Sequence, residues 1–156
     1  MKPTELRALL DAHGLRPSKA LGQNFLTDEN TARRIVRLAE VEPGDHVVEV
    51  GPGVGSLTVQ LAAAGARILA VELDKRLAPV VAEVVPSAEV VQADAMDADW
   101  GALLAGANRW VMVSNLPYNV ATPVVVRALE TAPMIDRFLV MVQREVGERL
   151  ASGVGD

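Results

Sequence analysis

The sequence has no cysteine among its 156 residues. This absence excludes disulfide bonds, thiolate nucleophiles and cysteine-based metal sites. The two histidines, His13 and His46, are far apart in the sequence, so a metal site is not expected either. We expect both histidines to be surface or packing residues.

Aromatic residues and long apolar runs are also scarce. Aromatic side chains make up 3% of the chain, although hydrophobic residues make up 50%. The apolar stretches are far shorter than the roughly 20 residues that span a membrane, and the first residues do not form the apolar segment of a signal peptide. We therefore expect a cytoplasmic protein without membrane contact, folded as one structural domain.

The net charge is −5, but it is unevenly distributed. Residues 1–38 carry seven lysines and arginines against four acidic residues, and the remainder is acidic. A basic N-terminal arm on an acidic body is compatible with contacts to nucleic-acid phosphates, although solvated surface charge is the commoner explanation. Charge alone therefore does not choose a partner.

The N-terminal part, residues 1–45, is predicted to be a helical arm followed by a loop. The spacing of its leucines predicts a helix over Thr4–His13. The stretch Ser18–Leu26 is polar and contains glycine, which predicts a loop that packs against the rest of the chain. The side chain of Asp28 can cap a second helix that runs to about Ala39.

From residue 46 to residue 156 the pattern alternates between strands and helices. Such alternation is typical of an α/β fold in which helices cover both faces of a mostly parallel sheet. The expected strands are Val47–Val50, Ile68–Glu72, Glu89–Gln92, Trp110–Ser114 and Phe138–Val142. The expected helices are Leu57–Ala64, Leu77–Val85, Trp100–Leu104, Pro123–Leu129 and a last one through Glu145 and Leu150.

The stretch Val47–Thr58 changes from a β-branched strand to glycines and then to a helix start. Gly51, Gly53 and Gly55 form the turn, where the missing Cβ atoms allow a ligand to approach the backbone. The new helix offers unpaired N–H groups beside it. The pattern indicates a nucleotide site, and an ordinary turn between a strand and a helix is the alternative.

The ends of the next two predicted strands carry carboxylates. Ligands of open α/β sheets bind beyond the carboxyl ends of the strands. Glu72 can accept hydrogen bonds from both ribose hydroxyls, or it can be a helix-start carboxylate, although Asp74 is the likelier cap. Asp94, followed by Ala95, can accept the exocyclic amine of an adenine, or it can be a surface residue of a loop. Together these residues fit one adenosine-containing cofactor.

The glycine spacing separates two classes of cofactor. A dinucleotide fingerprint would place a third small residue where Ser56 stands, and a dehydrogenase would need a proton-transfer group that neither histidine supplies. The spacing present is GxGxG, preceded by Glu49. It resembles the first motif of Rossmann-like methyltransferases that depend on S-adenosylmethionine.

The fourth predicted strand ends in SNLPYNVATP, and this set resembles the catalytic motif of amino-group methyltransferases. If the Asn115 side-chain oxygen and the Leu116 carbonyl accept the two N6 hydrogens of an adenine, the nitrogen lone pair points at the methyl group. Pro117 fixes φ and removes a competing donor, and Tyr118 offers a face on which an extruded base can stack. The alternative is a proline-containing turn with a buried tyrosine.

The motifs together resemble the ribosomal RNA adenine N6,N6-dimethyltransferase family over essentially the whole chain. They occur in the family's order as LGQNFL, VVEVGPGVGSLT, AVELD, QADAMD, NLPYNVATP and MVQREVGERL. The resemblance implies that S-adenosylmethionine is the methyl donor and S-adenosylhomocysteine the product. It implies the following cofactor contacts: Gln23, Asn24, Leu26, Gly51, Gly53, Glu72, Leu73, Asp94, Ala95 and Asn115. It further implies that Asn115, Leu116, Pro117 and Tyr118 hold the target base.

The resemblance also implies a substrate, which is a pair of adjacent adenosines near the 3′ end of small-subunit (16S-type) ribosomal RNA. The expected partner is this RNA in a pre-ribosomal subunit, with the protein acting as a monomer in ribosome biogenesis. Family members continue with further strands and a small helical domain, and neither is expected in this N-terminal fragment. Phe138 lies where such enzymes can place an aromatic ring beside the base, although core packing is the alternative.

Two other functions share part of this pattern. A resistance-type methyltransferase of large-subunit ribosomal RNA has the glycine turn and the Asn-x-Pro-Tyr set. An assembly factor that acts mainly by binding RNA would differ in its chemistry rather than in its fold.

Overall fold

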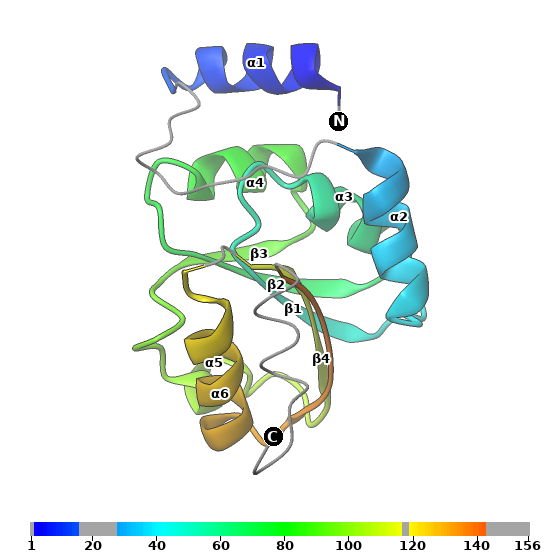
Figure 1. Ribbon diagram of the computed structural model, residues 1–156, viewed down its shortest axis with the longest axis vertical. Coiled ribbons are helices and arrows are strands. Elements are labelled where there is room, and N and C mark those ends of the chain that lie inside the picture. Colours follow the sequence, from blue (N-terminus) through cyan, green and yellow to red (C-terminus); the bar gives the residue numbers. More distant parts are fainter. Residues whose placement is uncertain (1, 16–27, 117–118, 143–156) are drawn as a thin grey trace.

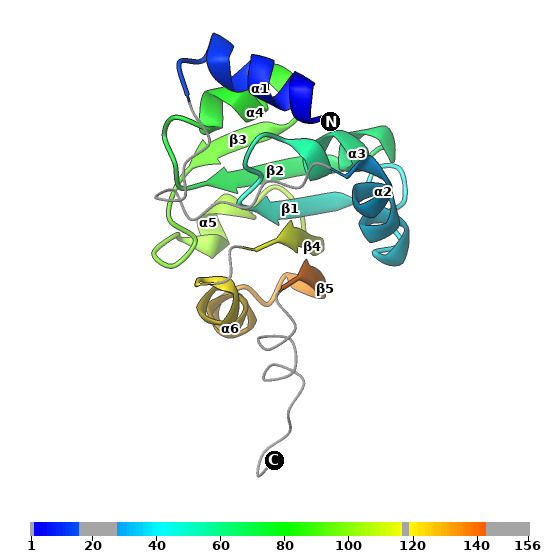
Figure 2. The same cartoon turned by 45° about the horizontal axis from the view of Figure 1, so that its top comes forward.

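The structure is a computed structural model that describes residues 2–15, 28–116 and 119–142. A parallel sheet of five strands forms its centre, in the order β3-β2-β1-β4-β5 (Figures 1 and 2). The strands are β1 (His46–Val50), β2 (Arg67–Glu72), β3 (Glu89–Gln92), β4 (Trp110–Asn115) and β5 (Ile135–Met141). Because all four strand pairs are parallel, the α/β prediction is confirmed.

Helices cover both faces of this sheet. The described helices are α1 (Pro3–Ala12), α2 (Glu29–Leu38), α3 (Ser56–Ala63), α4 (Ala78–Val84), α5 (Trp100–Leu103) and α6 (Ala121–Thr131). Figure 2 shows α2, α3 and α4 on one side of the sheet and α5 and α6 on the other. This separation follows from the strand order, because β2 and β3 extend from one side of β1 whereas β4 and β5 extend from the other.

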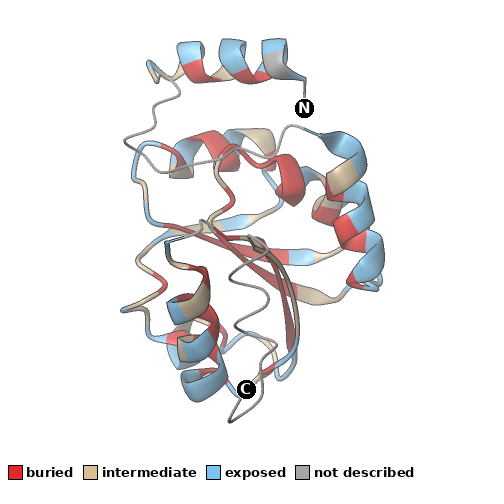
Figure 3. Ribbon diagram, viewed as in Figure 1, coloured by how far each residue is buried: buried red, intermediate tan, exposed pale blue. Residues whose placement is uncertain are grey.

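Each face of the sheet has its own apolar core, and Figure 3 shows the buried strands between them. Alternate strand residues point to opposite faces. Val48 and Met112 pack with Trp100 and the apolar face of α6. Val47 packs instead with α2 and α3. Near-continuous apolar strands are therefore needed, because a parallel sheet is buried on both sides.

Most predicted boundaries differ from the structure by one residue at most, but the starts of two elements were wrong by two or three residues, and both errors have a local cause. Strand β5 begins at Ile135 rather than Phe138, because the charged residues Asp136 and Arg137 concealed a strand whose register continues to Trp110. Helix α6 begins at Ala121, so Pro123 lies within its first turn and does not open the helix. Proline is tolerated there because the N–H that it lacks would have no partner within the helix.

Several local predictions can also be compared with the structure. The Asp28 carboxylate accepts a hydrogen bond from Asn30 N at 2.9 Å and caps α2 as expected. Asp74 was wrongly predicted to cap the following helix. Its Oδ1 accepts from Arg76 N at 2.8 Å, in a turn before the Leu77 cap of α4. The predicted helix through residues 145–150 lies outside the described residues.

The two histidines and Phe138 pack against other residues, as the packing alternative expected. The rings of His46 and Trp110 meet edge to face with centroids 5.1 Å apart. The His13 Nε2 atom donates to the Glu83 carboxylate. Phe138 packs against the core under α6. Among the described helices, none is long and apolar enough to cross a membrane.

Candidate functional site

The predicted site residues that the structure describes lie at the carboxyl ends of β1, β2, β3 and β4 or in the loops directly after them. Strand β1 lies between β2 and β4, and the order of the strands reverses there. In open α/β sheets a ligand binds in the crevice at such a reversal. The site is therefore placed by the topology as well as by the residue types.

The glycine turn after β1 is held by several backbone hydrogen bonds. Gly51 N donates to Val71 O at 2.9 Å, and Gly55 N donates to Pro52 O at 2.9 Å. Gly51 and Gly53 have φ angles of 69° and 61°, which side chains with a Cβ rarely adopt. The turn therefore requires glycine at these positions, and it keeps the backbone bare where a ligand can approach.

Glu72 ends β2 and joins the turn to the next loop. Its Oε1 accepts from Gly53 N at 3.0 Å, and its Oε2 accepts from Asp74 N at 2.9 Å. The residue is only 4% exposed, and burial raises the pKa of its carboxyl group, although these bonds oppose the shift. Each carboxylate oxygen can accept a second hydrogen bond, so Glu72 can bind hydroxyl groups without releasing the turn.

The residues beside Glu72 offer an apolar surface and a second carboxylate. The side chain of Leu73 is 59% exposed although it is apolar. Asp94 follows β3, and its Oδ1 accepts from Met96 N at 2.9 Å. Its Oδ2 has no partner among the residues that the structure describes. Ala95 is buried, and its carbonyl accepts from Trp100 Nε1 at 3.3 Å, which fixes this loop on the core.

Asn115 ends β4 and lies opposite Met141 of β5. Leu116 follows it, with its N–H donating to Met141 O at 3.2 Å and its side chain buried in the core under α6. This anchoring leaves Asn115 half-buried at the edge of the sheet. The backbone that would present the Leu116 carbonyl is thus held by this hydrogen bond and by the buried side chain.

Some of the predicted site residues cannot be compared with the structure. Gln23, Asn24 and Leu26 belong to residues 16–27, and Pro117 and Tyr118 follow Leu116; both segments lie outside the described residues. Their predicted roles remain predictions. Among the described residues, no group of three or more histidines and carboxylates is arranged to hold a metal ion.

The sequence interpretation gave no role to two polar residues behind the site. Glu49 is buried between β1 and α3, where Thr58 Oγ1 donates to its carboxyl group, and burial raises its pKa to about 8. Ser114 Oγ accepts from Val50 N at 2.9 Å and is fully buried. A single polar residue within an apolar strand was the available signal, because such residues are rarely buried without a partner.

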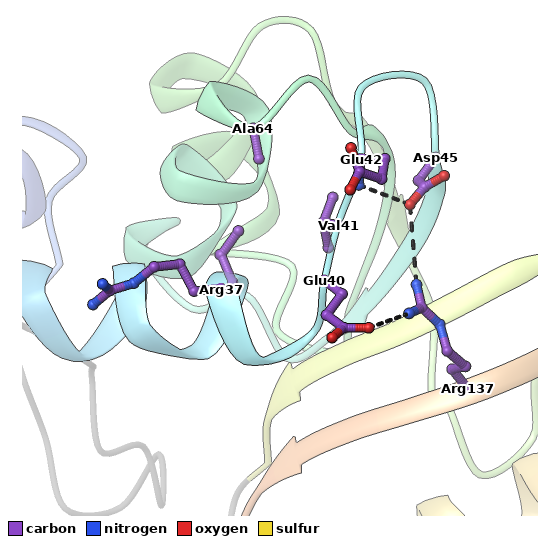
Figure 4. A pocket seen from close by; sticks show the side chains of 8 residues that line it. Arg37, Glu40, Val41, Glu42, Asp45, Ala64 and Arg137 are labelled. Carbon is purple, nitrogen blue, oxygen red and sulfur yellow. Dashed lines mark hydrogen bonds and ion pairs between the residues drawn. The ribbon is translucent and has the colours of Figure 1, made fainter.

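A cavity of about 780 Å³ lies at the other edge of the sheet, before β1. Figure 4 shows Arg137 reaching Glu40 and Asp45 there, at 3.9 and 4.0 Å. Opposite charges already neutralise one another in this cavity. None of the predicted site residues lines it, so the carboxyl edge remains the better candidate.

Comparison with known proteins gives a consistent result. The family model described as "Ribosomal RNA adenine dimethylase" matches residues 14–156. The Streptomyces coelicolor protein named "Ribosomal RNA small subunit methyltransferase A" is 50% identical over 158 residues, covering 98% of this chain and 55% of the relative. The relative of the same name from Leifsonia xyli is 49% identical, with 98% and 56% covered. The chain thus spans a little over half the length of these relatives.

Solved structures share the fold. A dimethyladenosine transferase from Plasmodium falciparum matches with a TM-score of 0.70 and 25% identity, over 85% of this chain and 48% of that one. The 23S rRNA methyltransferase ErmE matches with a TM-score of 0.69 and 35% identity, over 80% and 50%. The Rossmann-like methyltransferase fold expected from the sequence is therefore confirmed.

Proposed function

The chain belongs to the ribosomal RNA adenine dimethylase family, and on this premise we propose that it dimethylates N6 of adjacent adenosines near the 3′ end of small-subunit ribosomal RNA. The methyl donor is S-adenosylmethionine, and the product is S-adenosylhomocysteine. The RNA is bound in a pre-ribosomal subunit in the cytoplasm, with the protein acting as a monomer. This role makes the protein part of ribosome biogenesis.

The observation that carries the proposal is the meeting of four strand ends. The bare glycine turn follows β1, and the anchored Glu72 carboxylate ends β2. The Asp94 carboxylate lies in the loop after β3, and Asn115 ends β4. An adenosine has ribose hydroxyls and an exocyclic amine, which are donors that carboxylates accept. The donor and acceptor chemistry at this edge therefore fits an adenosine cofactor.

Each cofactor-binding residue has a separate task in this proposal. Gly51 and Gly53 leave room for the methionine part, and Glu72 accepts the ribose hydroxyls. The exposed side chain of Leu73 packs on the adenine, and Asp94 with Ala95 recognises its polar edge. Gln23, Asn24 and Leu26 close over the methionine end. S-adenosylmethionine supplies a methyl group on a positively charged sulfur.

The residues after β4 act on the acceptor. The adenine amine is a poor nucleophile because its lone pair is delocalised into the ring. The Asn115 side-chain oxygen and the Leu116 carbonyl would accept hydrogen bonds from its two N–H groups and turn the lone pair toward the methyl group. The nitrogen becomes positively charged as it takes the methyl group and then loses one proton to water, so no strong base is needed before transfer. Pro117 keeps a competing N–H away, and Tyr118 stacks on the extruded base.

Two observations favour the small-subunit substrate over the alternatives. Relatives named as small-subunit methyltransferases are about 50% identical, whereas ErmE, a 23S rRNA methyltransferase, is 35% identical. The motif SNLPYNVATP resembles the catalytic motif of amino-group methyltransferases, which an assembly factor acting only by binding would not require. Modification of large-subunit RNA and assembly by binding alone are therefore the secondary candidates.

The proposal is tested with labelled S-adenosylmethionine and small subunits that lack the modification. We expect label on two adjacent adenosines near the 3′ end of the RNA, mapped by primer extension. Large subunits serve as the matched substrate. Label only on large-subunit RNA would replace the proposal with the first alternative, and binding without any label would replace it with the second.

A further inference from the structure

A small apolar cluster, separate from the two cores of the sheet, connects the N-terminal helix with the glycine turn. Its buried members are Leu6 and Leu10 from α1, Val54 from the turn, and Leu77 and Val80 beside or within α4. Leu10 and Val54 are each only 1% exposed. We call this group the α1 cluster. It is the place where α1 meets the proposed cofactor site.

Val54 lies between residues whose positions matter for ligand binding. Its neighbour Gly53 donates to Glu72, and its other neighbour Gly55 has a φ of 89°. A Cβ atom at Gly55 would lie 3.3 Å from Val84 Cγ1 of α4, so the turn packs closely on that helix. The turn is thus held on one side by Glu72 and on the other by the α1 cluster.

Helix α1 is itself fixed at its C-terminal end. His13 Nε2 donates to the Glu83 carboxylate of α4, and Leu15 N donates to Leu10 O at 2.8 Å. Figure 2 shows α1 lying across α4 and away from the face that α5 and α6 cover. No α1 residue belongs to the two sheet cores among the described residues. Among the described residues, α1 therefore packs on α4 and on the turn rather than on the strands of the sheet.

We propose that α1 is a positioning element of the cofactor site, because Leu6 and Leu10 hold Val54 and so keep the glycine turn in the conformation that binds S-adenosylmethionine. The proposal rests on the function proposed above. Without α1, the bonds of Gly51 and Gly53 remain, but the Val54 side chain loses the surface that covers it. A turn that occupies its binding conformation for only part of the time binds a ligand more weakly in proportion.

Leu10→Ala is the direct test in the 156-residue chain. We expect the Kd for S-adenosylmethionine, measured by calorimetry, to rise about tenfold, as for a turn that is competent about a tenth of the time. The amides of Gly53 and Gly55 should exchange with solvent faster, whereas those of β1 and β2 keep their protection. Leu10→Met keeps an apolar side chain of similar volume at this position, so its Kd for S-adenosylmethionine should equal that of the unmodified chain.

Ile35→Ala is the matched control, because Ile35 is a buried helix residue of the core that contains α2 and α3. It should lower the melting temperature and leave the Kd unchanged. Trp100 and Trp110 both lie in the opposite core, so their emission reports whether each variant is folded. If Leu10→Ala does not fold, the milder Leu6→Ala replaces it, since Leu6 is already 8% exposed.

The two proposals fail in different ways. Unchanged Kd and unchanged exchange at Gly53 and Gly55 in a folded Leu10→Ala chain overturn the role of α1. An equal loss of affinity in Ile35→Ala also overturns it, because general destabilisation would then be the cause. If the unmodified chain binds no S-adenosylmethionine, the proposed function fails, while the exchange measurement still decides whether α1 holds the turn.

Discussion

The buried carboxyl groups of Glu72 and Glu49 both lie near the glycine turn, but their different surroundings indicate different roles. Glu72 accepts two backbone N–H groups at the end of β2, next to the exposed Leu73. Glu49 is enclosed between β1 and α3 with the Thr58 hydroxyl as donor. Its pKa is raised chiefly by burial and further by the negative charge of Glu72. Glu72 is therefore suited to binding, and Glu49 to holding a proton.

The pH dependence of stability tests the state of Glu49. The pKa rises from its ordinary value of 4.5 to about 8, so the folded chain binds this proton more tightly than the unfolded chain does. The corresponding stabilisation is complete below pH 4.5, falls as the pH rises toward 8, and is absent above that. Urea unfolding should show a loss on the order of a few kcal/mol across this range. In Glu49→Gln that loss should disappear. If this variant and the unmodified chain show the same pH dependence of unfolding, Glu49 does not hold a proton in the folded chain.

The affinity for S-adenosylmethionine is expected to depend more on the negative charge of Glu72 than on the shape of its side chain. Glu72→Gln keeps one oxygen acceptor near the turn but removes the negative charge. Hydrogen bonds to charged groups contribute about 1.5–3 kcal/mol, so the Kd for S-adenosylmethionine should rise roughly 10- to 100-fold. Calorimetry measures this, with Glu89→Gln at the exposed start of β3 as control. Equal affinities for both variants would remove Glu72 from the site.

Asn115 is expected to act on the acceptor rather than on cofactor affinity. Asn115→Ala removes the side-chain acceptor at the end of β4, so methyl transfer to RNA should fall by a factor of about 100 or more, in the range seen when one catalytic hydrogen-bonding group is lost. The affinity for S-adenosylmethionine should stay within a fewfold range. Transfer assays and calorimetry on the same preparation separate the two quantities. Undiminished transfer would exclude the assigned role.

At the scale of elements, β1 and β4 separate toward the site. Their paired residues are Val47 with Val111 and Val48 with Met112, whereas the pairing of β1 with β2 continues to Val50. Where that pairing with β4 ends, Ser114 Oγ accepts the Val50 N–H. A side chain thus replaces a backbone acceptor, which satisfies a buried donor while the two strands diverge.

Removal of this hydroxyl should weaken the junction of the two strands. Ser114→Ala leaves the buried Val50 N–H without its partner, which costs about 1–3 kcal/mol of the free energy of unfolding. Denaturant unfolding measures the loss. Thr131→Val is the control, because the exposed Thr131 hydroxyl donates only to Arg127 O on its own helix, and its removal should have little effect. If both substitutions lower the free energy of unfolding by similar amounts, the hydrogen bond between Val50 N and Ser114 Oγ does not contribute more to stability than an exposed one.

The bounds of helices and strands were predicted best where the apolar pattern ended at residues that favour turns or loops. Strand β3 has the predicted bounds because its four residues lie between a proline-containing turn and an acidic loop. Strand β5 was predicted too short because Asp136 and Arg137 read as loop residues. Their partners, Arg109 for Asp136 and Glu40 with Asp45 for Arg137, are distant in sequence. Such pairings cannot be read from local sequence.

At the scale of the whole molecule, the proposed cofactor residues that the structure describes all lie within β1 to β4 and the loops that follow these strands. The net charge of −5 offers little general attraction for RNA phosphates. The relatives from Streptomyces and Leifsonia are nearly twice as long as the region they share with this chain. We therefore expect these 156 residues to be sufficient for cofactor binding, whereas full RNA binding requires the longer chain that the relatives have.

A comparison of this chain with the whole Streptomyces coelicolor relative tests that separation. We expect the two Kd values for S-adenosylmethionine to agree within about tenfold, because the same strand ends form the site. The affinity for small-subunit RNA should be weaker for the 156-residue chain, and its salt dependence shallower, since fewer phosphates are neutralised. Filter binding at several salt concentrations measures this. Equal RNA affinity and equal salt slopes would contradict the expectation.

The sequence by itself determined the class of fold, the place of the glycine turn and the residue types that stand at the strand ends, because strand periodicity, glycine spacing and the set around Asn115 are local patterns. Only the tertiary structure decided how these residues are supported. The bond from Gly53 to Glu72, the bond from Val50 to Ser114 and the contact of α1 with Val54 join residues that are 19 or more positions apart. Such contacts depend on strand order and helix packing, which no local pattern encodes.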